Sequence, residues 1–258
     1  MLTIRLTEGD GKPLWVTYHS LDSLSEKQER YLTDLIERCD ACIYRVDKSN
    51  REWEDYIDVE SLAKFYMVQE IMGHREAFMG STYLYKDRGY NEKLKFGPLW
   101  DMGAWVYNGG INSFIYENPP YDEQHWIAEV SKFPHFQEVV REIWNSFRNN
   151  LDLHELESKV VTHIQTAAEN NYKRWQFPQL AVTIEEGWDN FSRDRAKKIA
   201  FLDGKWGVPL SISNPYMRPK DTISAVYTID GRRAYSTEKQ SLLIKNGKKY
   251  MNVTPKLK

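Results

Sequence analysis

The sequence predicts an α+β protein whose core lies mainly on helices, with short strands near both ends and a small hairpin near residue 90. Apolar residues recur at spacings of three and four over much of residues 23–207, as in amphipathic helices. Short alternating segments are bounded by glycine, proline or asparagine, as in strands and their turns. The chain has 258 residues, of which 41% are hydrophobic and 14% aromatic, enough to form a packed core.

Two short strands are predicted at the start of the chain, within residues 2–18, on either side of a turn at residues 9–13. The next segment offers hydroxyl groups as helix caps at Ser23 and Ser25. Apolar residues then recur at helical spacing to about Tyr44, which predicts the first helix.

Cys39 and Cys42 lie in this helical stripe at C-x-x-C spacing. Redox pairs and half-sites for zinc use the same spacing. A zinc site needs further Cys or His residues, and the sequence has no second C-x-x-C. The helical context therefore favours two buried thiols that pack as small apolar groups.

A second helix is predicted from Asp58, a good N-cap residue, to Gly73, a plausible stop. Strands are predicted at residues 82–86 and 94–100, and the polar segment 87–91 supplies the turn between them. This part of the chain therefore has the order helix, then hairpin.

A long loop rich in Asn, Gly and Pro is predicted at residues 101–123. A loop of this length inside a compact domain is more often functional than incidental. The pattern then becomes helical again, and it predicts three helices near residues 136–147, 153–175 and 188–202.

The composition changes near residue 213, so we divide the chain into a first region, residues 1–213, and a tail, residues 214–258. The tail carries ten Lys or Arg and three Asp or Glu, whereas the rest of the chain carries 25 and 34. Alternating segments at residues 225–229 and 242–244, each followed by a glycine turn, predict a small β unit. The acidic balance of the first region argues against nucleic-acid binding there.

No stretch approaches the roughly 20 apolar residues of a membrane-spanning helix, so no membrane span is expected. The first residues are not followed by the apolar core of a signal peptide. We therefore expect either a cytoplasmic protein or a chain that begins inside a longer one.

Three features of the first region have residue types suited to chemistry. His74–Glu76 places polar groups at the end of an apolar helix, Asp101 is expected at the C-terminal end of the hairpin's second strand, and residues 108–118 form a polar loop. Phosphoryl transfer uses one carboxylate to orient the acceptor and another to hold Mg²⁺. A short hairpin brings its ends together, so Glu76 and Asp101 are expected to face one site. The same residues are also typical of a solvated helix end and an ordinary turn.

Five segments have an order and spacing that is more specific than any single motif: Tyr56–Glu70, Glu76–Phe78, Ser81–Asp87, Phe96–Asp101 and Arg195–Trp206. Together they resemble segments of the CotH family, the atypical kinases similar to spore coat protein H, over about residues 12–207. The resemblance implies the mainly helical lobe of a protein-kinase-like fold and transfer of phosphate from ATP to protein.

The resemblance also implies roles for individual residues. Asp101 matches the carboxylate that binds the metal, Glu76 stands where the family has its catalytic Asp, and His74 stands where many members have Asn. Glu76 and Asp101 are therefore the catalytic candidates, His74 and Asp101 the nucleotide-binding candidates, and Asp101 the Mg²⁺ ligand. Gly103 replaces a second Asp found in many members. Glu in place of Asp moves the carboxylate by one methylene, and a misplacement of about 1 Å can cost about a hundredfold in rate.

In the family, the strands and the Lys that bind ATP precede the segment at which this chain begins. Residues 1–18 contain no glycine-rich phosphate loop. We therefore expect this chain to lack half of the nucleotide cleft and to bind Mg²⁺ and ATP only weakly.

Residues 226–233 and 243–249 resemble the C-terminal sorting domain of type IX secretion substrates of Bacteroidetes. This resemblance implies an extracellular or cell-surface location. The structural alternative is a small β-hairpin that packs on the helical region.

The leading hypothesis is an exported CotH-like kinase that acts on a protein. The alternative is a noncatalytic cell-surface protein that binds a protein or a surface glycan through the loop at residues 108–118, and a structural surface protein is a third class. Paired carboxylates also occur in glycoside hydrolases, but the order of elements does not favour that class.

Overall fold

The computed structural model describes residues 2–6, 8, 14–19, 23–89, 91–103, 106–107, 110–117, 126–150, 152–175, 183–207, 227–228, 242–245 and 248–251. The chain divides into two compact units, Met1–Pro209 and Leu210–Lys258. The first unit combines helices with two small antiparallel sheets, so the α+β prediction is confirmed. In the described part of the chain, no helix is both long and apolar enough to cross a membrane.

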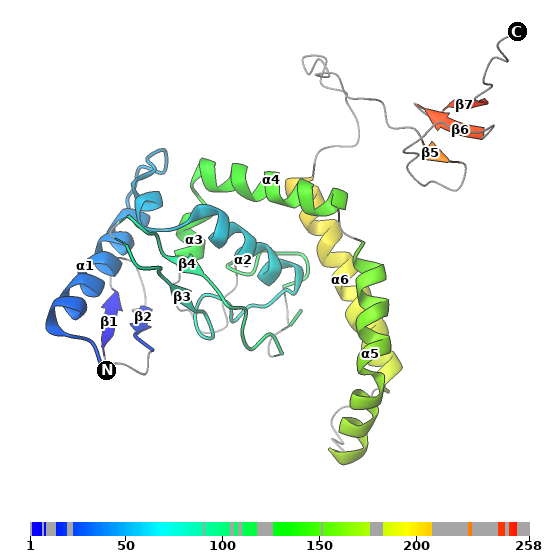
Figure 1. Ribbon diagram of the computed structural model, residues 1–258, viewed down its shortest axis with the longest axis horizontal. Coiled ribbons are helices and arrows are strands. Elements are labelled where there is room, and N and C mark those ends of the chain that lie inside the picture. Colours follow the sequence, from blue (N-terminus) through cyan, green and yellow to red (C-terminus); the bar gives the residue numbers. More distant parts are fainter. Residues whose placement is uncertain are drawn as a thin grey trace, which may run out of the picture. The chain divides into compact units, whose positions relative to one another are not determined.

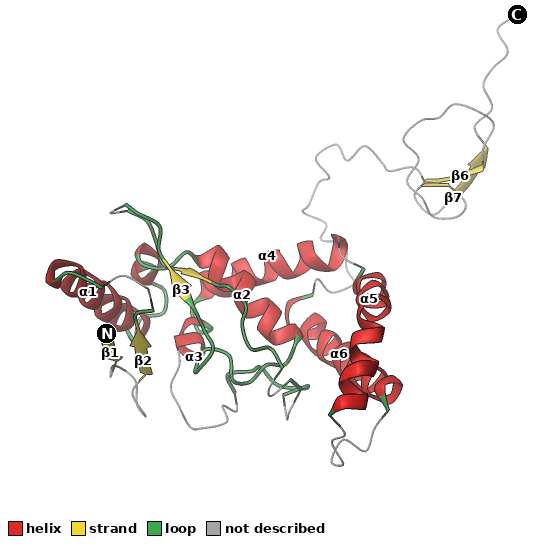
Figure 2. Cartoon of the chain, turned by 60° about the horizontal axis from the view of Figure 1, so that its bottom comes forward, coloured by secondary structure: helices red, strands yellow, loops and turns green. Residues whose placement is uncertain are grey.

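The first unit begins with the antiparallel pair β1–β2, continues through helices to a second antiparallel pair, β3–β4, and ends in further helices (Figures 1 and 2). In chain order the elements are β1 (Thr3–Leu6), β2 (Leu14–Thr17), α1 (Glu26–Ile43), the 3-10 helix η1 (Glu52–Asp55), α2 (Val59–Ile71), β3 (Leu84–Tyr85), β4 (Lys95–Phe96), α3 (Trp126–Val130), α4 (Pro134–Asn150), α5 (Leu153–Arg174) and α6 (Ile184–Trp206).

The second unit contains β5 (Tyr227–Thr228), β6 (Leu242–Lys245) and β7 (Lys248–Met251), which form one antiparallel sheet in that order. Strands therefore occur in both tail segments where alternation predicted them. The predicted turns at residues 9–13, 230–231 and 246–247 lie outside the described residues.

The predicted helices are confirmed, and the structure shows which side chains begin them. The Ser25 hydroxyl accepts a hydrogen bond from the backbone N–H of Gln28, and Oε1 of Gln28 accepts one from the backbone N–H of Ser25. Together these bonds form a capping box at α1. The Asp58 carboxylate accepts from the Ser61 amide at 2.8 Å and begins α2. The short helix η1 was not predicted, because four residues are too few to show a helical period.

The hairpin strands are shorter than predicted, two residues each, and Asp101 does not lie at the end of a strand. Pairing ends at Phe96, because Gly97 has a φ of +140° and Pro98 has no backbone N–H to extend the ladder. Asp101 instead lies in the segment that follows. The hairpin is joined to α2 by hydrogen bonds from the Asp58 amide to the Leu94 carbonyl and from the Leu94 amide to the Tyr56 carbonyl.

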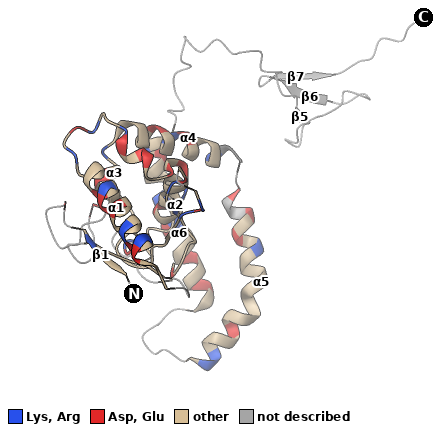
Figure 3. Cartoon of the chain, turned by 60° about the vertical axis from the view of Figure 1, so that its left-hand side comes forward, with Lys and Arg blue, Asp and Glu red and all other residues tan. Residues whose placement is uncertain are grey.

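Most charged residues of α1 are exposed, as Figure 3 shows in blue and red, and the buried side of the helix is apolar apart from Asp40. This stripe includes Cys39 and Cys42, which are free thiols and buried, so the packing interpretation is confirmed. Burial raises the pKa of both thiols, which keeps them in the unreactive protonated form.

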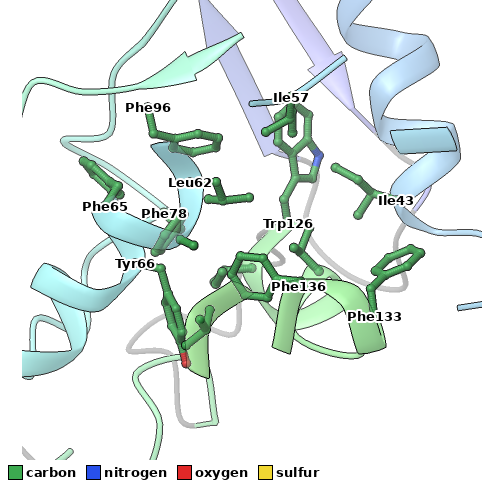
Figure 4. Close-up of a cluster of buried hydrophobic side chains, with 14 of the residues drawn as sticks. Ile43, Ile57, Leu62, Phe65, Tyr66, Phe78, Phe96, Trp126, Phe133 and Phe136 are labelled. Atoms are coloured by element: carbon green, nitrogen blue, oxygen red, sulfur yellow. The ribbon is translucent and has the colours of Figure 1, made fainter. Parts of the chain in front are cut away.

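The core of the first unit is an aromatic cluster built from α2, η1, α4 and the hairpin (Figure 4). Trp53 packs on Phe133 with ring centroids 5.4 Å apart, and Tyr66 packs on Phe136 at 5.8 Å. Phe65 lies edge-on to Phe78 at 5.4 Å. These rings account for much of the high aromatic content, since each buries a large apolar area.

Two buried or partly buried carboxylates fix helices to this core through indole groups. Trp126 Nε1 of α3 donates to Asp40 Oδ1 of α1 at 2.6 Å, and burial raises the pKa of Asp40. Trp144 Nε1 of α4 donates to Asp203 Oδ1 of α6 at 3.0 Å, and Arg148 binds both oxygens of the same carboxylate. Helix α6 is therefore tied to α4 by directional bonds as well as by packing.

Because Asp58 caps α2, which leads to the candidate residues His74 and Glu76, Asp58→Ala should lower the free energy of unfolding by about 1 kcal/mol. Urea denaturation followed by circular dichroism measures this change. Glu60→Ala in the same turn removes only an exposed pair with Lys64, and it should change stability by less than about 0.5 kcal/mol. Equal effects of the two substitutions would show that the cap contributes nothing specific.

Candidate functional site

The candidate site begins where α2 ends, at Gly73. This residue has a φ of +56°, which favours glycine. A Cβ at this position would lie 2.7 Å from Cδ1 of Tyr107, whose hydroxyl donates to the Ile71 carbonyl at 2.6 Å. The end of α2 is therefore fixed from one side by the segment that follows the hairpin.

The turn after Gly73 has an unusual backbone. Phe78 has a φ of +72° and Ser81 a φ of +49°, and Asp101, which comes next to Ser81 in space, has a φ of +53°. Side chains other than glycine adopt this region rarely, at a cost of about 1–3 kcal/mol each, and such residues concentrate at functional sites. The ring of Phe78 is buried against Phe65, which compensates part of that cost.

His74 is buried in this turn, with a relative exposure of 1%. Its Nδ1 pairs with Gln69 Oε1 at 2.8 Å, and since this oxygen can only accept, Nδ1 carries the proton. Burial lowers the pKa of His74, and the charges of Glu76 and Asp101 oppose this shift. The ring is therefore neutral and holds the turn, and contact with a nucleotide would require the turn to open.

The two predicted carboxylates lie in one neighbourhood. Glu76 is half-buried and Asp101 is exposed, and both lie near enough to His74 to act on its pKa. Ser81 Oγ donates to Asp101 Oδ2 at 3.4 Å. Glu76 Oε1 lies 3.7 Å from the point that a Cβ on Gly80 would occupy, one residue before Ser81. The turn 76–81 thus carries a carboxylate at one end and a contact to Asp101 at the other.

Ser81 was not among the residues predicted for the site. The signal was present in the spacing, because Ser81 is the fifth residue after Glu76. In protein kinases the residue five places after the catalytic-loop Asp is the Asn that holds a second Mg²⁺. Ser81 has a hydroxyl group at this spacing, where those kinases have a carboxamide.

The site offers oxygen donors that suit a hard cation. Among the described residues there is no group of three or more His, Cys, Asp and Glu side chains that could enclose a metal. Mg²⁺ commonly takes one or two carboxylates and keeps waters and phosphate oxygens as its other ligands. Asp101 with the Ser81 hydroxyl fits this donor set, and Gly103 adds no ligand.

A buried ion pair between α2 and α6 supports the site. It was not among the residues predicted from the sequence. Lys198 Nζ of α6 lies 2.7 Å from Glu70 Oε2 of α2, and both side chains have zero exposure. Lys198 also donates to the carbonyls of Gly110 and Ser113, and Glu70 Oε1 accepts from the Ile115 amide. The pair fixes the segment 110–115 between the two helices.

Two exposed aromatic residues lie beside Asp101. Trp100 and Tyr83 are 58% and 38% exposed, and their rings meet edge-on with centroids 6.2 Å apart. His19 lies next to Tyr83 at 6.5 Å. The carboxylates therefore border an aromatic surface that could contact a ligand.

A family model described as CotH kinase protein matches residues 9–198 of this chain. The matched range contains β2 to the first part of α6, including Glu76, Ser81, Asp101 and both partners of the buried ion pair. No match was found among curated proteins or among solved structures.

Because the pKa of His74 is lowered in the folded protein, the protein should lose stability as the pH falls below about 6.5, where the unfolded histidine takes up a proton and the folded one does not. His74→Asn should reduce this dependence between about pH 5 and pH 7. Urea unfolding across that range measures it, with exposed His163→Asn of α5 as the control. Identical profiles for wild type and His74→Asn would contradict a neutral, buried His74.

Removing one partner of the buried pair leaves the other charge uncompensated, so Lys198→Met should cost about 3–5 kcal/mol of stability. The double variant Glu70→Gln/Lys198→Met should lose clearly less than the sum of the two single variants. The control Lys197→Met removes an exposed side chain of the same helix and should cost less than about 0.5 kcal/mol. Additive losses in the double variant would show that the two charges do not depend on each other.

Proposed function

This chain belongs to the CotH kinase protein family, and on that premise we propose that its site transfers the terminal phosphoryl group of ATP to a protein hydroxyl. The observation that carries the proposal is the convergence of Glu76, Ser81 and Asp101 at one end of the β3–β4 hairpin. Such a reaction needs one carboxylate to orient the acceptor hydroxyl and a second to hold Mg²⁺.

The order of elements supports a protein-kinase-like arrangement. In protein kinases a catalytic loop of the form H-R-D-x-x-x-x-N precedes the metal-binding Asp of the D-F-G motif. Here α2 leads to His74–Ser81, the hairpin follows, and Asp101 comes next. The likeness covers the chain order, whereas Glu76 and Ser81 stand where those kinases have Asp and Asn.

In the proposed reaction Glu76 accepts the proton of the acceptor hydroxyl while that oxygen forms a bond to the terminal phosphorus and the bond to the ADP oxygen breaks. Asp101, with Ser81, would hold the Mg²⁺, which would neutralise phosphate charge. Glu76 reaches one methylene further than an Asp would, which favours a slow reaction. His74 contributes by keeping the turn in place through Gln69.

Nucleotide affinity of this chain is proposed to be low. No Lys side chain is among the contacts of Glu76, Ser81 or Asp101 that the structure describes, and Lys198 is engaged with Glu70 and two carbonyls. On this proposal a dissociation constant for Mg²⁺-ATP weaker than about 1 mM is expected, which corresponds to about 4 kcal/mol.

An extracellular or cell-surface location forms part of the proposal, and it rests on the resemblance of the tail to a type IX secretion sorting domain. The small antiparallel sheet of the second unit is compatible with such a domain. A protein at the cell surface is then the proposed acceptor.

Phosphate transfer from labelled ATP to protein tests the proposal, with the full chain at high concentration and Mg²⁺ present. Glu76→Gln and Asp101→Asn should each lower the rate by at least about a hundredfold, since each removes a charge used in the transition state. Asp87→Asn removes an exposed carboxylate from the hairpin turn and should leave the rate unchanged. Equal rates for all four proteins, or no transfer by the wild type, would reject the catalytic proposal.

A second candidate function is noncatalytic binding of a protein or glycan, and the exposed pair Tyr83 and Trp100 favours it. Aromatic rings at the surface provide contact area with little loss of conformational freedom. In that case ligand binding would depend on Trp100 and would survive Asp101→Asn, which has no effect on the rings.

A further inference from the structure

Two exposed rings beside the candidate site form a corner. Tyr83 directly precedes β3 and Trp100 directly precedes Asp101, and their relative exposures are 38 and 58%. The ring centroids lie 6.2 Å apart, and the angle between the ring planes is 86°. A flat group that stacks on the ring standing edge-on therefore presents its own edge to the face of the other ring. Both arrangements are favourable between aromatic systems, so the corner suits a planar ring.

These two rings differ from four other exposed rings of the chain, each of which has a cation of the chain beside it. The charged groups lie 5.2–6.0 Å from the ring centroids: Arg5 over Trp15, Lys86 over Tyr31, Lys95 over Tyr85 and Arg174 over Trp175. Tyr83 and Trp100 instead contact rings, namely each other and, for Tyr83, the ring of His19. In the described part of the chain no Lys or Arg lies over either of them, so their faces are available to a ligand.

The corner adjoins the oxygen atoms of the candidate site. Ser81 contacts Asp101 and Tyr83 contacts Trp100, so the same two segments of the chain carry both pairs. Ser81 and Tyr83 are two residues apart, which keeps their Cα atoms within about 7 Å of each other, and Trp100 and Asp101 are neighbours. The corner and the proposed Mg²⁺ ligands therefore lie side by side.

A ligand with a planar ring at one end and phosphates at the other would use both features. ATP is such a ligand, and its ribose and triphosphate are long enough to join a ring on the corner to a terminal phosphate at Asp101. A glycan or a peptide would use the rings and leave the oxygen donors unused. We propose that Tyr83 and Trp100 hold the adenine base of ATP by stacking, while Asp101 and Ser81 face its Mg²⁺-phosphate end. This inference rests on the proposed function for the identity of the ligand.

Recognition by stacking determines which nucleotides the site accepts. Every base has a π face, so stacking on aromatic side chains tolerates different bases. GTP should therefore bind within about threefold of ATP. Pyrimidine nucleotides, which have a smaller ring system, should bind more weakly than either. The site is expected to accept purine nucleotides without selecting adenine.

Nuclear magnetic resonance of the isotope-labelled full chain, titrated with Mg²⁺-ATP, tests the base site. The indole N–H signal of Trp100, identified by its absence from Trp100→Phe, should move with ATP. Trp100→Ala should weaken ATP binding at least about fivefold, the loss expected for one stacked base. Trp100→Phe keeps a ring and should bind ATP more tightly than Trp100→Ala. Trp175→Ala removes a ring of similar exposure at the end of α5 and should bind ATP like the wild type.

Ligands that carry only one part of ATP separate the base from the phosphates. Adenosine has no phosphate, so its binding should depend on Trp100 and be unchanged in Asp101→Asn. Inorganic triphosphate with Mg²⁺ has no base, so Asp101→Asn should weaken its binding and Trp100→Ala should not. A Trp100 signal that stays in place up to about 20 mM ATP overturns the proposal. So does a signal that moves with a glucose oligosaccharide but not with ATP.

The base site and the proposed reaction can fail separately. If no phosphate is transferred but adenosine binding depends on Trp100, the reaction is rejected and the base site stands. If transfer depends on Glu76 and Asp101 but Trp100→Ala leaves ATP binding unchanged, the reaction stands and the base site is overturned. Circular dichroism should show the same helix content for every variant, because Trp100 and Trp175 are exposed.

Discussion

The buried contact between Glu70 and Lys198 is the interaction on which the candidate site depends. An ammonium group has three N–H donors, and Lys198 has three acceptors around it: the Glu70 carboxylate and the carbonyls of Gly110 and Ser113. Burial raises the pKa of Glu70, and the charge of Lys198 is the main factor that opposes this shift. Removing two charges from water is costly, and the pair is tolerated because the charges lie 2.7 Å apart and Lys198 also donates to two carbonyls. Its structural result is that α2, α6 and the segment 110–115 are joined at one point.

Further contacts connect the Glu70–Lys198 pair to the candidate site. Gly110 lies against the side chain of Arg75, and Tyr107, three residues earlier, packs on Gly73. The turn at residues 74–81 is thus held on one side by Tyr107 and Gly110. On the other side, buried Phe78 packs against Phe65 and Phe96 with ring centroids 5.4 and 5.9 Å apart. A turn with left-handed residues persists because surrounding packing leaves it no alternative, which is how rigid sites are generally built.

The sequence predicts those features that depend on neighbours along the chain, and it misses those that depend on distant residues. Helix periodicity and the caps Ser25 and Asp58 are local, so α1 and α2 were predicted closely. The Lys198–Glu70 pair joins residues 128 positions apart, and an isolated Lys in an amphipathic helix has no local sign of burial. Asp101 was expected at a strand end, because a propensity pattern cannot show where ladder pairing stops. The family resemblance indicated Glu76 and Asp101, but the role of Ser81 needed the contact itself.

The backbone conformation of Ser81 and Asp101 is relevant to the proposed phosphotransferase function. Ser81 and Asp101 are both held at positive φ, although neither is glycine and Asp101 is exposed. An exposed residue gains little packing energy from such a conformation, so its cost of about 1–3 kcal/mol is offset by other parts of the fold. A chain free of any requirement at these positions could relax them or use glycine, as it does at Gly73. The positive φ values of Ser81 and Asp101 therefore support the proposed site, in which the oxygen atoms of both side chains would have to be aimed.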